Sequence, residues 1–205
     1  MDFFDSVWDR VAEDYATDVP LYPLQVEAIK PFLEVGCSVL DVGCGPSKQA
    51  NHLCTDTRTY IGLDASEPMI RLARERVGTL QASPMFVRGS ATALPFRDDS
   101  FSWAMSLNNT LGILPNWIAR EHAVSEMLRV ARRGCLIEVL AANRLEVVSS
   151  RLFRDRLGKP QPYRSARFTE HYFRRLAKTY GVKAKFSYVR QSTNFSYYFL
   201  AALTV

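Results

Sequence analysis

The most specific chemical pattern in this sequence is a Gly-x-Gly turn that directly follows a short apolar run. The run Val39–Val42, in which Asp41 is the one charged residue, leads into Gly43-Cys44-Gly45. Glycine is needed where the backbone takes positive φ or passes within contact distance of a ligand. In an open α/β sheet, ligands bind beyond the carboxyl ends of the strands. We therefore expect a ligand at this turn, although Gly-x-Gly alone would also fit a tight turn without one.

The residues around this turn narrow the class of ligand. Lys48 stands where a dinucleotide-binding loop has its third glycine, which allows close helix–strand packing. The G-x-x-x-x-G-K-[ST] loop that cradles phosphates is absent from the sequence. Asp64 ends the apolar run TYIGLD, 19 residues after Gly45, which is the spacing at which a carboxylate meets a ribose diol. Loop and acid together favour a nucleoside ligand.

Strand and helix signals alternate through the first 140 residues and must position these groups. Strands are expected at 37–43, 59–64, 84–89, 101–109 and 135–141, and helices at 2–15, 26–33, 47–54, 67–77 and 116–134. A helix at 169–180 precedes two strands, 183–191 and 194–205, that should pair as a hairpin. This order predicts an α/β three-layer sandwich with a seven-stranded, mostly parallel sheet that ends in an antiparallel hairpin.

Length and composition bound the kind of protein. The chain has 205 residues, 47% of them hydrophobic and 23% charged, which predicts one globular domain over residues 1–205. We find no apolar run near the roughly 20 residues of a membrane helix, and the acidic start MDFFDSVWDR lacks a signal core. Four cysteines without a CxxC pair and three histidines indicate reduced thiols and no metal site. We expect a cytoplasmic protein without a membrane partner.

Four segments in order carry a family resemblance: VLDVGCGPS, YIGLDASEPMIRLAR, VRGSATALPFRDDSFSWAMSLNN and MLRVARRGCLIEV. They resemble successive motifs of the seven-stranded (class I, Rossmann-like) S-adenosylmethionine-dependent methyltransferases, in particular the small-molecule, methyltransferase type 11-like branch. The terminal hairpin is similar to the family's last two strands. The resemblance implies a methyltransferase that uses S-adenosyl-L-methionine as its methyl donor.

The resemblance also implies a cofactor site. Asp41, Gly43, Cys44 and Gly45 would surround the methionine portion, and Asp64 would hold the ribose hydroxyls. The other implied contacts are Ala65, Met69, Ser90 and Ala91 around the adenine, and Leu107 and Asn108 below the sulfonium.

Four places depart from the family pattern: Ser47, Ser90, Ser102 and the segment 132–135, where the family has a Pro-Gly-Gly turn. Ser47 replaces the third glycine of the first motif. Ser90 stands where an aspartate commonly accepts a hydrogen bond from the adenine amino group, and a hydroxyl accepts without charge. We expect a weaker adenine contact.

A methyl group on a sulfonium is already electrophilic, so the protein must chiefly orient the acceptor and exclude water. No side chain stands out as a general base. The candidates for positioning the acceptor are Tyr15, Asn108, Asn109, Arg164 and Arg167. Asn108 and Asn109 could equally cap the loop after their strand. SLNNT is not the N-P-P-Y pattern of amide- and adenine-directed enzymes, which argues against such acceptors.

Charge is distributed unevenly along the chain. Residues 144–205 contain 13 Lys and Arg against three acidic residues, whereas residues 1–143 contain 13 against 18. Residues 1–35 are expected to form a helical lid, and residues 144–168 a basic insertion over the active-site end of the sheet. Arginine interleaved with aromatics suits a small anionic acceptor, RNA or a solvated face. The acidic remainder favours a small acceptor, and an RNA-directed methyltransferase or a cofactor-binding regulator without turnover are the alternatives.

Overall fold

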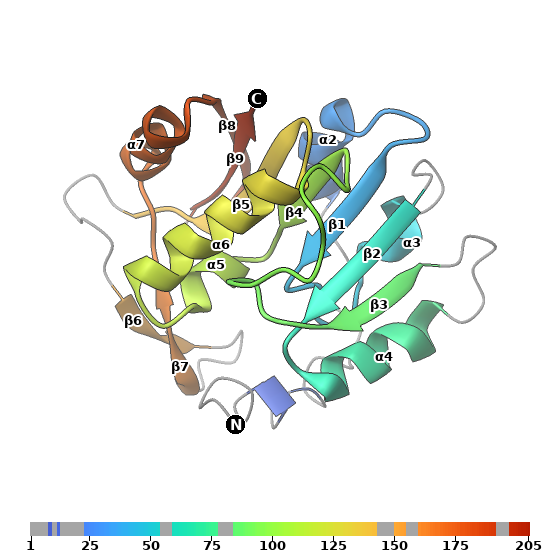
Figure 1. Ribbon diagram of the computed structural model, residues 1–205. Helices are drawn as coiled ribbons and strands as arrows, with labels where there is room; N and C mark the ends of the chain where they lie inside the picture. The colour runs from blue at the N-terminus through green and yellow to red at the C-terminus, as the bar shows by residue number, and fades with distance from the viewer. Residues whose placement is uncertain are drawn as a thin grey trace.

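A computed structural model describes residues 8–9, 12, 23–53, 59–77, 84–142, 150–154, 160–191 and 197–205. Within these residues, seven strands form one sheet in the order β3-β2-β1-β4-β5-β9-β8 (Figure 1). Their bounds are β1 Ser38–Val42, β2 Thr59–Asp64, β3 Met85–Arg88, β4 Trp103–Ser106, β5 Gly134–Leu140, β8 Lys183–Gln191 and β9 Tyr197–Thr204. Strands β1 to β5 pair in parallel, and β9 is antiparallel to both β5 and β8. The predicted sheet and its terminal hairpin are confirmed.

The order in which strands are added to the sheet reverses at β1. From β1 the chain adds β2 and β3 on one side, and then β4 and β5 on the other. The register pairs Asp41 of β1 with Gly62 of β2 and with Met105 of β4. In an open α/β sheet this switch point is where neighbouring loops part and a ligand can enter. The loops that follow β1, β2 and β4 therefore border the same potential ligand site.

Helices cover both faces of the sheet. Their bounds are α2 Pro23–Ile29, continued by a 3-10 turn at Lys30–Phe32, α3 Ala50–Leu53, α4 Glu67–Val77, α5 Thr110–Ile113, α6 Trp117–Val130 and α7 Glu170–Tyr180. Figure 1 shows α5 and α6 in front of the strands, with α2 and α3 behind them. In the part of the chain that the structure describes, no helix is long and apolar enough to cross a membrane.

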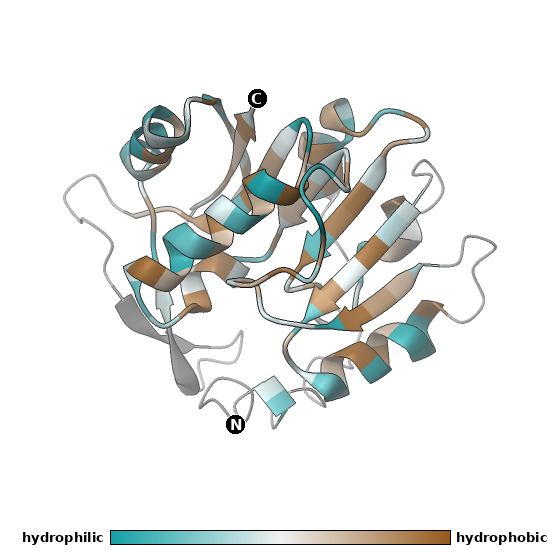
Figure 2. Ribbon diagram, in the orientation of Figure 1, coloured by the Kyte–Doolittle hydropathy of each residue, from teal (hydrophilic) through white to brown (hydrophobic). Residues whose placement is uncertain are grey.

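Most buried apolar side chains of the described residues pack in two large clusters, one on each face of the sheet. Val124 of α6 and Phe173 of α7 join Leu40 in one cluster, whereas Ile70 of α4 joins Val39 in the other. Adjacent strand residues separate in this way because side chains alternate across a strand. Helix α4 carries both brown and teal residues in Figure 2, as a helix with one buried face should. The predicted three layers are confirmed.

Several element ends differ from the prediction. Strand β4 stops at Ser106 instead of 109, because Asn108 and Asn109 have φ values of 54° and 62°, and the unpredicted helix α5 begins next to them. The helix predicted to run to Gly134 ends at Val130. Gly134 does not close that helix: it opens β5, where a Cβ would lie 1.9 Å from the carbonyl oxygen of Leu203.

The basic segment contains a strand pair that the sequence patterns did not predict. Strands β6 (Ser150–Arg154) and β7 (Pro160–Ala166) form a separate antiparallel two-stranded sheet. Directly after β7, Phe168 is fully buried in the core beneath α7, and its backbone bonds to Leu140 and Ala142. The pair is thus attached at its end to the carboxyl edge of β5. The helix predicted at 2–15 lies outside the described residues, apart from 8–9 and 12.

Candidate functional site

The Gly-x-Gly turn is held between β2 and α5. The backbone nitrogens of Gly43 and Cys44 both donate to the carbonyl of Leu63, at 2.7 and 3.1 Å. Gly43 has φ 73°, and a Cβ there would lie 2.1 Å from the methyl carbon of Thr110. Gly45 has φ 53°, and a Cβ there would meet nothing within 4 Å. Gly43 is therefore needed for close packing, whereas the backbone at Gly45 borders open space.

Asp64 is hydrogen-bonded to this turn. Its Oδ2 accepts from the backbone nitrogen of Gly45 at 2.8 Å, and its Oδ1 accepts from that of Ser66 at 2.9 Å. Burial raises the pKa of Asp64, against the lowering effect of these backbone donors. Each carboxylate oxygen accepts more than one hydrogen bond, so both retain capacity for hydroxyl donors. Ser66 directly precedes α4, and its hydroxyl accepts from the backbone nitrogen of Met69 at 3.4 Å, as an N-cap residue does.

Asp41 is fully buried beneath the same turn. Its Oδ2 accepts hydrogen bonds from the side-chain amide of Gln49 and from the hydroxyl of Tyr60. Its Oδ1 is buried and has no hydrogen-bond partner. Burial raises the pKa of Asp41 to about 7, against the lowering effect of Tyr60 and Gln49. A buried acceptor without a donor is rare in native proteins and points to a ligand that supplies one.

The serine that departs from the family pattern completes this network. Ser47 has φ 50°, a backbone conformation that explains the glycine usual there, and it is fully buried. Its hydroxyl lies 2.9 Å from that of Tyr60. The sequence patterns singled out neither Tyr60 nor Gln49. The signal for Tyr60 was a hydroxyl-bearing side chain inside an apolar strand, two residues from Gly62 and so on the same face.

The residues expected around an adenine lie after β2 and β3. Ala65 follows Asp64, and its carbonyl accepts from Arg88 of β3 at 3.0 Å. Met69 is buried on α4. Ser90 is exposed, and its hydroxyl lies 2.9 Å from that of Thr92. The residues predicted to contact the adenine thus lie near the ends of β2 and β3, on the same side of β1 as Asp64.

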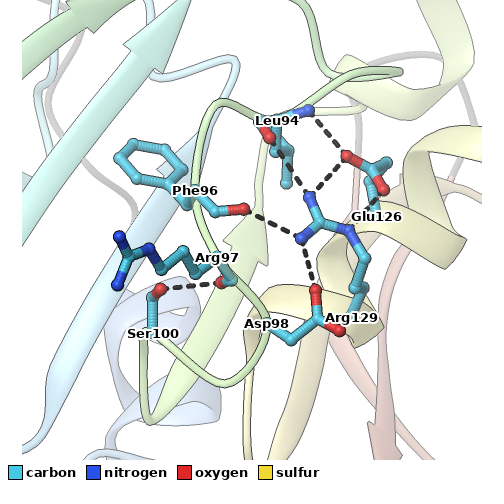
Figure 3. A network of polar contacts seen from close by, with 7 residues as sticks. All are labelled: Leu94, Phe96, Arg97, Asp98, Ser100, Glu126 and Arg129. Atoms are coloured by element: carbon cyan, nitrogen blue, oxygen red, sulfur yellow. Dashed lines mark hydrogen bonds and ion pairs between the residues drawn. The ribbon is translucent and has the colours of Figure 1, made fainter.

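The loop after Ala91 is tied to α6 by two charged side chains (Figure 3). Glu126 accepts from the backbone nitrogen of Leu94 at 2.7 Å. Arg129 donates to the carbonyls of Leu94 and Phe96, and pairs with Glu126 and Asp98, each at 2.7 Å. The Arg129 guanidinium holds the pKa of Glu126 below its usual range. This clamp fixes the loop that continues from the expected adenine contacts.

The segment after β4 places three further candidates. Leu107 is buried, Asn108 is exposed, and Asn109 is buried. The Asn109 amide donates to Ser165 Oγ and to the carbonyl of Ala166, and accepts from the backbone nitrogen of Leu140 at 3.0 Å. These contacts join the β4–α5 loop to β5 and β7. Asn109 occupies the N-cap position of α5, but its side chain makes no capping hydrogen bond to that helix.

A buried glutamate next to Asn108 was missed. Glu138 of β5 is fully buried, and its Oε2 accepts from the backbone nitrogen of Asn108 at 2.8 Å and from the side-chain amide of Gln25 in α2. That amide nitrogen also lies 3.3 Å from Asn108 Oδ1. Gln25 Oε1 is buried without a partner. Three segments distant in sequence therefore meet at the carboxyl ends of β4 and β5.

Two other candidates cannot be placed. Tyr15 and the side chain of Arg164 lie outside the described residues. Arg167 is half-buried just after β7. Among the residues that the structure describes, no three His, Cys, Asp or Glu side chains form a group that could hold a metal ion.

Comparison with known proteins adds a family match. Residues 39–134 match the family described as methyltransferase domain. An uncharacterized methyltransferase of Mycolicibacterium vanbaalenii is 36% identical over 107 residues, which cover 50% of this chain and 38% of that protein. This chain thus aligns with less than half the length of such curated relatives.

Solved structures share the fold across nearly the whole chain. A Methanosarcina mazei structure of a SAM-dependent methyltransferase aligns with TM-score 0.73 and 21% identity, covering 91% of this chain and 99% of that one. Magnesium protoporphyrin IX methyltransferase from Synechocystis PCC 6803, with bound SAM, aligns with TM-score 0.71 and 16% identity, covering 98% and 97%. The predicted family resemblance is confirmed.

Proposed function

We propose that this chain, which carries a methyltransferase domain of the class I, Rossmann-like fold, binds S-adenosylmethionine and methylates a small-molecule acceptor. The observation that carries this proposal is the bond between Asp64 and Gly45 at the sheet's switch point. It makes the acidic residue and the turn a single unit beside open space. Such a unit suits a nucleoside, whose ribose diol can donate to a carboxylate.

The residues present fit the whole cofactor. Asp64 would accept from the ribose hydroxyls, and the orphaned Oδ1 of Asp41 would accept from the α-ammonium of the methionine portion. Ala65, Met69, Ser90 and Ala91 would border the adenine, and the backbone of Gly43, Cys44 and Gly45 would border the methionine portion. S-adenosylmethionine supplies the activated methyl group when bound. The chain's own task is then to hold donor and acceptor in line and to exclude water.

We place the acceptor at the carboxyl ends of β4 and β5, beside Leu107 and Asn108. The contacts of Glu138 and Gln25 favour this position, because they hold the backbone of Asn108 and bring α2 next to it. Residues 1–35 and 144–168 would act as lids over this end and select the acceptor. The strand pair β6–β7 supports that role, since Asn109 joins β7 to the β4–α5 loop.

A small acceptor is also favoured by the relatives. The Synechocystis neighbour is named for a small molecule, magnesium protoporphyrin IX. An anionic group on the acceptor would suit the arginines of the basic segment, including Arg164 and Arg167, which could pair with it. We also propose a cytoplasmic location, which the buried thiols of Cys44 and Cys135 favour.

The test is a binding and turnover experiment on the full chain. Calorimetry should detect binding of S-adenosylhomocysteine, and a panel of small acceptors with S-adenosylmethionine should release S-adenosylhomocysteine. Absence of binding would overturn the proposal, and binding without turnover for any acceptor would favour a regulator. An RNA-directed enzyme would instead bind single-stranded RNA with an affinity that falls by orders of magnitude between 50 and 200 mM salt.

A further inference from the structure

Hydrogen-bond donors leave only one oxygen of the buried Asp41 carboxylate available. Oδ2 accepts from both the Gln49 amide and the Tyr60 hydroxyl. Oδ1 is equally buried and accepts from nothing. A proton that neutralises the carboxylate therefore settles on Oδ1, because Oδ2 already faces two donors. A cationic group that binds the ionised carboxylate must reach the same atom.

The direction of each hydrogen bond follows from the number of protons. Tyr60 has one hydroxyl proton, and the ionised Asp41 can only accept, so Tyr60 donates to Asp41. The 2.9 Å contact between the hydroxyls of Ser47 and Tyr60 must then use the proton of Ser47. The result is a chain of donation from Ser47 to Tyr60 to Asp41. In a buried site each bond in such a chain polarises the next, which makes Tyr60 a better donor.

From these contacts, and resting on the proposed function, we propose that a proton and the α-ammonium of the cofactor compete for Asp41 Oδ1. Ser47 and Tyr60 are positioning residues that favour the ionised carboxylate and therefore the cofactor. Ser47, which stands where the family usually has glycine, therefore contributes to cofactor binding through its hydrogen bond to Tyr60. Binding of the cofactor near neutral pH should release a proton from the protein.

The charged surroundings of Asp41 agree with this competition. On β2, Tyr60 lowers the pKa of Asp41, and the negative charge of Asp64 raises it. On the turn itself, burial raises the pKa of the Cys44 thiol, which is therefore neutral beside Asp41. On β4 the register partner is Met105, which carries no charge. With the pKa of Asp41 at about 7, the protonated and the ionised carboxylate are both populated near pH 7.

The experiment compares two nucleosides on the full chain by calorimetry. S-adenosylhomocysteine has the α-ammonium, whereas 5′-methylthioadenosine has the same adenosine and lacks it. From pH 6 to pH 8 the affinity for S-adenosylhomocysteine should rise by about tenfold relative to that for methylthioadenosine, as the ionised fraction rises. The ratio also removes any contribution of Asp64, which would act on both ligands. At pH 6.5, titrations in phosphate and in Tris should differ in heat, which shows proton release.

Three variants locate the effect. Tyr60→Phe should move the midpoint of the affinity ratio to higher pH, because Asp41 loses a donor. Ser47→Gly should move it in the same direction by less, and it suits the φ of 50° at that position. Tyr172→Phe is the matched control: it removes a buried hydroxyl without a hydrogen-bond partner, from the core on the other face of the sheet. It should leave the midpoint unchanged.

The outcomes separate this inference from the proposed function. If the wild type binds both nucleosides with a ratio that does not change with pH, the inference is wrong and the proposed function stands. If it binds neither, both are wrong. Should Tyr60→Phe fail to fold, the wild-type ratio and Ser47→Gly decide alone: a flat ratio, or a midpoint that Ser47→Gly leaves in place, contradicts the inference.

Discussion

Asp64 Oδ2 and the backbone nitrogen of Gly45, separated by 19 residues in sequence, are joined by a hydrogen bond of 2.8 Å. The bond ties the carboxyl end of β2 to the turn after β1. Asp64 also holds the start of α4 through Ser66. One side chain thus sets both the position of the turn and the surface offered to a ligand.

We expect Asp64→Ala to weaken binding of S-adenosylhomocysteine at least tenfold, because charge-assisted hydrogen bonds are worth about 1.5–3 kcal/mol each. Asp64→Asn keeps one accepting oxygen and should lose less. Calorimetry gives the affinities, and circular dichroism checks the fold. The control is Asp99→Asn, an exposed position with φ 55°, where asparagine is well tolerated. Unchanged affinity in Asp64→Ala would remove Asp64 from the site.

The pair of Gln25 and Glu138 can be tested by exchange. Gln25→Glu sets two carboxylates together and should lower the free energy of unfolding by about 1–3 kcal/mol, whereas Glu138→Gln keeps one accepting oxygen and should lose less. The double variant Gln25→Glu with Glu138→Gln restores a donor and an acceptor. Urea unfolding should show recovery of part of the loss. Additive losses would mean that the two side chains do not interact.

Asn109 should behave as a structural residue. Asn109→Gly keeps the φ of 62° accessible and removes the side-chain bonds to β5 and β7, which should cost about 2–3 kcal/mol of unfolding free energy. Asn108→Gly, with φ 54°, is the neighbouring control and should cost less. Urea unfolding measures both. A weaker acceptor affinity with unchanged stability in Asn109→Gly would instead favour a direct contact with the acceptor.

The clamp of Glu126 and Arg129 predicts a pH dependence of stability. Since the folded state lowers the pKa of Glu126 below 4.5, its contribution to stability is full above that value. It is lost as the pH falls through the lowered pKa of the folded state. Urea unfolding of the wild type and of Glu126→Gln should therefore differ at pH 6, and the difference should shrink as the pH falls through the lowered pKa of Glu126. A constant difference across this range would contradict the prediction.

In the clamp of Glu126 and Arg129, the planar guanidinium of Arg129 bonds to four groups at once. Arg129→Lys keeps the charge, but a lysine cannot donate to two carbonyls and two carboxylates from one planar group. We expect a loss of about 1–2 kcal/mol in unfolding free energy. Arg97→Lys, an exposed residue of the same loop, is the control and should have little effect. Equal losses in both variants would show that the contacts in Figure 3 do not stabilise the loop.

The sequence by itself determined the sheet, its terminal hairpin and the pairing of a glycine turn with Asp64. Those features depend on local signals: apolar runs of strand length, helical periodicity and a fixed spacing from Gly45 to Asp64. Adjacent parallel strands bring their carboxyl ends together, so the topology alone places these two groups side by side. The elements whose ends were predicted wrongly depend on contacts with distant residues, such as that of Gly134 with Leu203.

Only the tertiary structure decided which polar side chains meet inside the protein. Gln25 and Glu138 are 113 residues apart, and Tyr60 reaches Asp41 from a neighbouring strand. No local pattern encodes such a pair, because a buried polar group is satisfied by whatever partner the packing brings to it. The same holds for Asn109, which the sequence left open between two roles. Its partners on β5 and β7 came into reach only when the chain had folded.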